Sequence, residues 1–228
     1  MQLPELARYH RVIAPDLAGF GFTECPVGTT FDQGVWLQQV VDLLDALEVA
    51  RVHVVGNSFG GSMALALAID HPDRVDRLVL MGSVGVPFEI TDGLDRVWGF
   101  DPDRDDMGEL MRNVFAYDDS LITEELVASR QQASMRPRTR AAFSAMFPEP
   151  RQRWVDAMAH DEASIRAIKA RTLVVHGRDD NVIPLQNSLT LLDWIDDSRL
   201  HVFGRCGHWT QVEHSTAFTE LLLDFFAE

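Results

Sequence analysis

Two hydrophobic patterns alternate along the chain. Nearly continuous apolar runs at residues 11–17 (RVIAPDL), 51–56 (RVHVVG) and 77–83 (RLVLMGS) predict buried β-strands. Residues 31–49 and 62–72 instead carry apolar side chains at helical spacing, so they predict helices between these strands. Strands without polar alternation, separated by helices, indicate a mostly parallel sheet with helices on both faces.

The alternation breaks in the middle of the chain and then resumes. Residues 86–168 are rich in helix formers, acidic patches, Phe, Met and Pro, which predicts a helical insertion. Strands are expected again at 171–177 and 199–204, with helices at 185–195 and 215–227. The chain is therefore expected to divide into a first core part, a helical lid and a second core part, at 1–85, 86–168 and 169–228.

Composition and net charge limit the classes of molecule that this protein is expected to bind. With 46% hydrophobic and 24% charged residues the chain reads as an ordinary soluble protein, and no apolar run is long enough to cross a bilayer. No signal peptide is visible, and Cys25 and Cys206 fit no metal or redox spacing, so a cytoplasmic location is expected. The net charge of -15 argues against nucleic acid and anionic membranes as partners, and an anionic small substrate would need a local arginine.

The segment Gly56-Asn57-Ser58-Phe59-Gly60 matches G-x-S-x-G between a predicted strand and a predicted helix. A turn this tight strains the serine backbone and requires small residues two positions away on each side. It raises the hydroxyl above the sheet at the positive end of a helix. Ser58 is therefore the candidate nucleophile.

A serine nucleophile needs a base, and the base needs an orienting acid; in this context the chain order is serine, acid, histidine. Asp180 follows the strand at 171–177 and is the candidate acid, while the neighbouring Asp179 is expected to face solvent. His208 lies in a glycine-flanked loop after the last strand and is the candidate base. The other seven histidines lie in strands, at a helix end or in polar segments, and for His176 we expect a structural role near the acid loop.

The elbow, this order and the segments "HGRDDNVIP" and "GHW" resemble the α/β-hydrolase fold. "GNSFGG", "LVLMGSVGVPFEITDGLDRVWGF", "FAYDDSLITEEL", "AMFPEPRQRWVDAM" and "HVFGRCGHWTQVEH" further resemble the meta-cleavage-product hydrolases of aromatic catabolism, nearest to the branch acting on 2-hydroxymuconate semialdehyde and its alkyl relatives. The resemblance covers essentially the entire chain.

The resemblance implies hydrolysis of a carbon–carbon bond in a small anionic dienoate, giving 2-hydroxypenta-2,4-dienoate and a carboxylic acid, with no metal or organic cofactor. It implies that Asn57 and Arg130 bind the dienoate carboxylate and 2-hydroxyl group and that Trp209 forms a pocket wall. The backbone N–H of Phe59 would be one oxyanion donor. A homodimer is implied in the same way.

The chain departs from that family at its start. The family's first strands and oxyanion loop are not found, so we expect a fragment in which Arg11–Leu17 moves, pairs directly with Val52–Val55 or stays loose. One oxyanion donor would then lack a source, and loss of one such donor costs about 10²–10³ in rate. Two alternatives therefore stay open: an ester or lactone hydrolase of the same fold, and a catalytically silent fragment.

Overall fold

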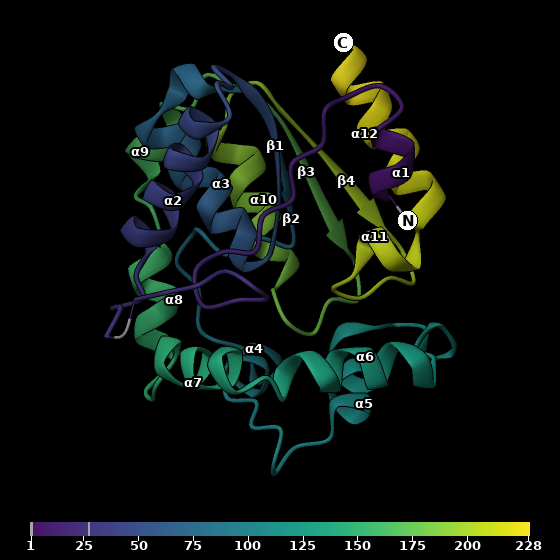
Figure 1. Ribbon diagram of the computed structural model, residues 1–228. Coiled ribbons are helices and arrows are strands. Elements are labelled where there is room, and N and C mark those ends of the chain that lie inside the picture. Colours follow the sequence, from purple (N-terminus) through teal and green to yellow (C-terminus); the bar gives the residue numbers. More distant parts are fainter. Residues whose placement is uncertain (1, 27) are drawn as a thin grey trace.

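The computed structural model describes residues 2–26 and 28–228, and its centre is a parallel sheet of four strands (Figure 1). The strands follow the chain in the order β1-β2-β3-β4. They span Val52–Asn57 (β1), Val75–Met81 (β2), Arg171–Gly177 (β3) and Ser198–Phe203 (β4). The four strands predicted from residue 51 onward are confirmed, including their nearly continuous burial in β2 and β3.

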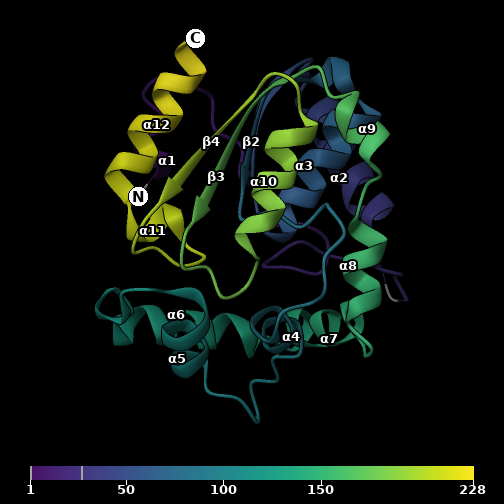
Figure 2. The ribbon, with the colours of Figure 1, turned by 180° about the vertical axis from the view of Figure 1, so that it is seen from behind.

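The two faces of the sheet are buried by different helices, as the apolar strands predicted. Leu78 and Leu80 of β2 pack on one face with helices α2, α3, α9 and α10, which lie to the right of the strands in Figure 2. Val79 and Met81 pack on the other face with α1 and α12. This period of two within one apolar run is what places a strand between two helical layers. These helices span Gln2–Leu6 (α1), Gln33–Ala46 (α2), Phe59–Asp70 (α3), Glu162–Arg166 (α9), Leu185–Trp194 (α10) and Ser215–Ala227 (α12).

The middle of the chain forms short helices beyond the carboxyl ends of the strands (Figure 1). They are α4 (Asp92–Trp98), α5 (Met107–Leu110), α6 (Glu124–Ser134), α7 (Pro137–Met146) and α8 (Gln152–Met158), while α11 (Thr210–Glu213) follows β4. An apolar cluster that includes Trp36, Met63, Trp98, Phe147 and Val155 joins this layer to the core. We call α4 to α7 the helical layer; its assignment as a lid at residues 86–168 stays a prediction.

The prediction of a strand at Arg11–Leu17 is wrong. These residues are outside helix and strand, and in the described chain their backbone makes no hydrogen bond to β1. Both ends of the segment are held elsewhere: α1 packs on α12, and Gln39 of α2 bonds the backbone of Asp16 and Ala18. The segment therefore runs opposite β1 across a groove of about 880 Å³ instead of beside it, and Val55 is 43% exposed.

Within the described residues, no helix is both long enough and apolar enough to pass through a lipid bilayer.

Candidate active site

Ser58 stands at the turn between β1 and α3 in a strained conformation. Its φ of 54° and ψ of -117° are rare for a residue with a side chain. Three backbone bonds hold the turn: Ser58 N–H donates to the Met81 carbonyl at 2.8 Å, and the Ser58 carbonyl accepts from Gly61 at 2.9 Å and from Val84 at 3.2 Å. The elbow predicted from the G-x-S-x-G spacing is thus present and is fastened to the end of β2.

At only one of the two elbow glycines does the surrounding structure leave no room for a side chain. A Cβ added to Gly56 would lie 2.3 Å from the carbonyl oxygen of Gly60, on the other side of the turn. A Cβ added to Gly60 would meet no atom within 4 Å. The expectation of obligatory small residues on both sides therefore holds at Gly56 and fails at Gly60, because Gly60 has open space on its outer side.

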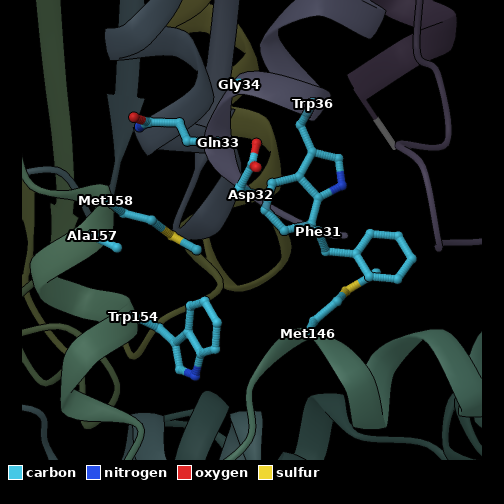
Figure 3. Close-up of a pocket in the computed structure, with 9 residues that line it drawn as sticks. All are labelled: Phe31, Asp32, Gln33, Gly34, Trp36, Met146, Trp154, Ala157 and Met158. Carbon is cyan, nitrogen blue, oxygen red and sulfur yellow. The ribbon is translucent and has the colours of Figure 1, made fainter. Parts of the chain in front are cut away.

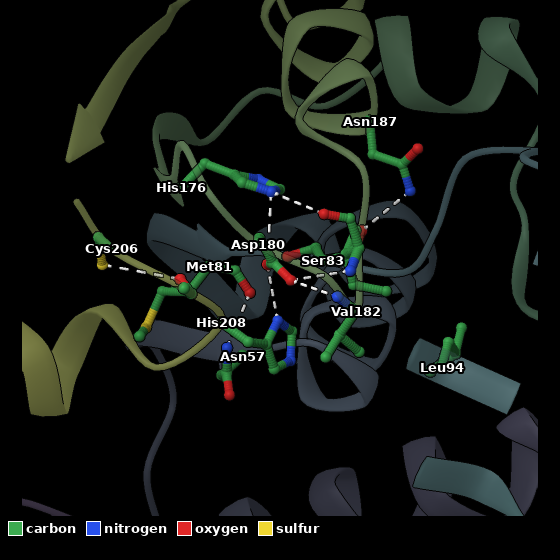
Figure 4. Close-up of polar contacts among 12 residues, drawn as sticks. Asn57, Met81, Ser83, Leu94, His176, Asp180, Val182, Asn187, Cys206 and His208 are labelled. Atoms are coloured by element: carbon green, nitrogen blue, oxygen red, sulfur yellow. Dashed lines mark hydrogen bonds and ion pairs between the residues drawn. The ribbon is translucent and has the colours of Figure 1, made fainter. Parts of the chain in front are cut away.

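Asp180 is held by hydrogen bonds to both of its carboxylate oxygens (Figure 4). Oδ1 accepts from the backbone N–H groups of Val182 at 2.7 Å and Ile183 at 3.0 Å, and Oδ2 lies 2.7 Å from Nδ1 of His208. Burial alone would raise the pKa of Asp180, but the charge and hydrogen bond of His208, with further help from His176 and Ile183, hold it below its usual range. The carboxylate is therefore ionised and oriented toward His208.

The competing carboxylate of Asp179 points elsewhere. Its side chain is 31% exposed, lies 3.3 Å from the Arg178 guanidinium and accepts from the Cys206 N–H at 3.3 Å. It forms neither a hydrogen bond nor an ion pair with His208, as expected from the shift of one residue along the turn.

His176 contacts the same carboxylate. Its ring is fully buried, and Nε2 lies 3.4 Å from Oδ2 of Asp180 (Figure 4). Nε2 also lies 3.0 Å from the Ile183 carbonyl, and Nδ1 lies 2.6 Å from the Ser188 hydroxyl. A carbonyl can only accept, so Nε2 carries the proton and Nδ1 accepts from Ser188. Burial lowers the pKa of His176, so the ring stays neutral. The structural role expected near the acid loop is thus a direct contact with the candidate acid.

The His208 side chain is 2% exposed, and its backbone N–H donates to the Phe115 carbonyl at 2.7 Å. A Cβ on Gly82, whose φ is +43°, would lie 3.1 Å from Oδ2 of Asp180 and 3.2 Å from Nδ1 of His208. Gly82 directly follows Met81, whose carbonyl accepts the hydrogen bond from Ser58. The elbow and the Asp180–His208 pair therefore meet at the end of β2. The sequence analysis assigned no role to Gly82. The signal that could have identified it is its position in a Gly-Ser pair directly after an apolar strand.

No hydrogen bond joins the Ser58 hydroxyl to His208 in the structure, although both residues are described. Hydrogen bonds between a nucleophile and its base are often long in unliganded enzymes and shorten when substrate binds. The geometry therefore supplies an oriented acid–base pair beside a strained serine.

The expected substrate-binding residues are only partly brought together. Trp209 stacks on Phe115 with centroids 4.6 Å apart, and the guanidinium carbon of Arg130, exposed on α6, lies 5.9 Å from the Trp209 ring centroid. Among the residues that the structure describes, no carboxylate forms an ion pair with Arg130. Asn57 is the last residue of β1, and its amide donates to the Met81 carbonyl at 3.1 Å. Phe59 starts α3, and its ring packs edge-on against Trp36 at 4.7 Å.

A separate cavity of about 200 Å³ lies between the start of α2 and helices α7 and α8 (Figure 3). It contains none of the predicted site residues. Its walls are Phe31, Asp32, Gln33, Gly34, Trp36, Met146, Trp154, Ala157 and Met158. In the described part of the chain, no group of three or more His, Cys, Asp or Glu side chains is arranged to hold a metal ion.

Comparison with known proteins places this geometry in context. The family described as alpha/beta hydrolase fold matches residues 2–215. The chain is 57% identical over 226 residues to 2-hydroxymuconate semialdehyde hydrolase of Pseudomonas sp. strain CF600, covering 99% of this chain and 80% of that protein. It is 55% identical over 225 residues to 2-hydroxy-6-oxo-2,4-heptadienoate hydrolase of Pseudomonas putida strain F1, covering 99% and 81%.

Solved structures give the same result. The fold superposes with a TM-score of 0.96 on a crystal structure of the meta-cleavage product hydrolase CumD from Pseudomonas fluorescens IP01, at 47% identity, covering 99% of this chain and 83% of that one. A 2-hydroxy-6-oxo-6-phenylhexa-2,4-dienoate hydrolase from Rhodococcus sp. strain RHA1 superposes with a TM-score of 0.92 at 34% identity, covering 99% and 83%.

Proposed function

The chain belongs to the alpha/beta hydrolase fold family and, within it, to the meta-cleavage product hydrolases, and we propose that it hydrolyses a carbon–carbon bond in 2-hydroxymuconate semialdehyde or a related 2-hydroxy-6-oxo-2,4-dienoate. The products are 2-hydroxypenta-2,4-dienoate and a small carboxylic acid. The observation that carries the proposal is the oriented Asp180–His208 pair beside the Ser58 elbow, in a chain 57% and 55% identical to enzymes named for these substrates.

The site residues act in two stages. The dienol substrate first becomes a ketone by losing the proton of its 2-hydroxyl group and gaining one on carbon, so that the later cleavage expels a stabilised enolate. His208 then removes a proton from the Ser58 hydroxyl, or from a water molecule, and the resulting oxygen nucleophile adds to the distal carbonyl. Asp180 stabilises the imidazolium that forms and keeps its Nδ1–H directed inward.

Collapse of this adduct breaks the carbon–carbon bond. The electron pair of the bond passes into the dienoate, which takes its proton from His208, and the distal fragment leaves as the carboxylic acid, after hydrolysis of an ester if Ser58 attacked. The backbone N–H of Phe59, in the first turn of α3, stabilises the negative oxygen of the adduct.

The dienoate carboxylate needs a cation, since the protein carries a net charge of -15. Arg130 is the candidate, because it lies beside Trp209, which adjoins His208, and a guanidinium can grip a carboxylate with two hydrogen bonds. Asn57 is the candidate for the 2-hydroxyl group; to bind it, the amide would exchange its bond to the Met81 carbonyl for one to substrate.

The test is loss of the yellow dienolate absorbance of 2-hydroxymuconate semialdehyde and its 6-methyl analogue. Turnover by the 228-residue chain is expected to vanish in Ser58→Ala and to persist in Ser144→Ala, which changes an exposed serine of α7. An ester or lactone is the competing substrate class, because an acid, a base and a serine would serve it equally. A folded chain that hydrolyses p-nitrophenyl esters yet leaves dienolates unchanged would favour that class.

We further propose a cytoplasmic homodimer. Light scattering on the purified chain measures the subunit number, and a monomer at micromolar concentration would contradict this part.

A further inference from the structure

The carboxylate of Glu213, at the end of α11, joins two parts of the chain that lie far apart in sequence. Oε1 accepts from the backbone N–H of Gly207 at 2.8 Å. Oε2 accepts from the backbone N–H groups of Tyr117, at 2.8 Å, and Asp118, at 3.2 Å. One carboxylate oxygen of Glu213 therefore binds the loop that carries His208, and the other binds the segment between α5 and α6.

Three further contacts join the same two segments. The His208 N–H donates to the Phe115 carbonyl at 2.7 Å, and the Phe115 ring stacks on Trp209. The Arg205 guanidinium lies 6.0 Å from the centroid of the Tyr117 ring. Glu213 thus completes a junction in which the backbone on both sides of the candidate base is fixed to the helical layer.

We propose that Glu213 is a positioning residue for catalysis: it holds the His208 loop against residues 115–118 and so fixes the imidazole relative to Ser58. The proposal rests on the proposed function in that His208 is the base. The sequence pattern missed Glu213 because an acidic residue five positions after a histidine is unremarkable; only the fold places its two oxygens between two sets of N–H groups.

A carboxylate suits this place better than an amide. Each of its oxygens can accept, so donors on both sides are satisfied at once, whereas a glutamine would turn an NH₂ group toward one of them. Hydrogen bonds from N–H groups to a carboxylate are also roughly twice as strong as those to a neutral acceptor. Glu213→Gln therefore keeps the size of the side chain and breaks one of its two connections.

The experiment compares the 228-residue chain with Glu213→Gln and with Glu220→Gln, a matched change at an exposed glutamate of α12. Hydrogen exchange is followed at the amides of Gly207, Tyr117 and Asp118 and, as a measure of global opening, at Val174 in β3. The rate at which a fluorophosphonate labels Ser58 measures activation of the serine by His208 without using a dienoate. Steady-state kcat and KM are measured with the dienolate substrate.

Glu213→Gln is expected to speed exchange at the junction amides while Val174 is unchanged, and to lower kcat and the labelling rate about 10- to 100-fold, since a misplacement of about 1 Å costs about 10²-fold. KM is expected to change little, and Glu220→Gln should match the parent chain.

Two results would overturn the proposal. One is an unchanged labelling rate despite faster exchange at the junction; the other is exchange at Val174 that rises as much as exchange at Tyr117, which would make Glu213 a residue of general stability. Absence of labelling in the parent chain would overturn it too, because His208 would then activate nothing. A labelling effect without any dienolate turnover would refute the proposed function and leave the role of Glu213 standing.

Discussion

The two glycines of the elbow, Gly56 and Gly60, allow a matched test of why this turn is built as it is. Gly56→Ala would place a Cβ 2.3 Å from the Gly60 carbonyl oxygen, 2.7 Å from its carbon and 2.8 Å from the Cα of Gly61. All three atoms belong to the backbone, so no side chain can turn away, and the turn itself must open by about 1 Å to restore ordinary contact. Gly60→Ala adds the same methyl group where no atom lies within 4 Å.

The two substitutions are expected to change the free energy of unfolding in opposite directions. Overpacking costs typically about 1–3 kcal/mol, and a clash with backbone on the far side of a strained turn belongs at the upper end, so we expect Gly56→Ala to lower the free energy of unfolding by about 3 kcal/mol. Gly60 lies in the first turn of α3, where alanine is the better helix former, so Gly60→Ala should raise it by up to about 1 kcal/mol.

Urea unfolding followed by circular dichroism measures both variants. With a slope of about 2–3 kcal/mol per molar urea for a chain of this size, Gly56→Ala should lower the midpoint by about 1 M. Opening of the turn also moves the Ser58 hydroxyl, so kcat should fall by about 10²-fold. Equal midpoints for Gly56→Ala and the parent chain, or equal destabilisation by both substitutions, would refute the argument that this contact shapes the elbow.

Three other predictions concern charge. Asp180→Asn should keep the fold but lower kcat by about 10⁴-fold, as loss of the orienting acid does in serine proteases, and an unchanged kcat would exclude Asp180 as that acid. Arg130→Gln should raise KM for the dienoate by about 10- to 100-fold, the worth of a charge-assisted hydrogen bond, and leave hydrolysis of a neutral ester unchanged; an equal loss on both substrates would argue against carboxylate binding. Burial lowers the pKa of His176, His160 and His53 in the folded chain, so the unfolded chain binds more protons and the free energy of unfolding should fall as pH drops below about 6.5; a pH-independent urea midpoint between pH 7.5 and 5.5 would contradict this.

Local signals were sufficient for most of the core. The apolar runs predicted β1 to β4 within two residues at each end, and the last helix, Ser215–Ala227, was predicted at its observed bounds. The triad candidates also came from local context, because a glycine-bounded serine and an acid and histidine in loops after strands are identifiable without distances. The contact between Asp180 and His208 then followed from the parallel order of the strands, which brings their carboxyl ends to one edge.

Tertiary structure decided the rest. Residues 11–17 have the composition of a buried strand, but a strand also needs a partner within hydrogen-bonding distance, and contacts of the flanking segments with α12 and α2 hold this one across a groove from β1. Open space at Gly60, the bond between His176 and the acid loop, and the junction made by Glu213 likewise depend on segments distant in sequence. Periodicity along a chain reports which face of an element is buried, whereas the partner that covers it, and the room left beside it, are set only when all elements pack together.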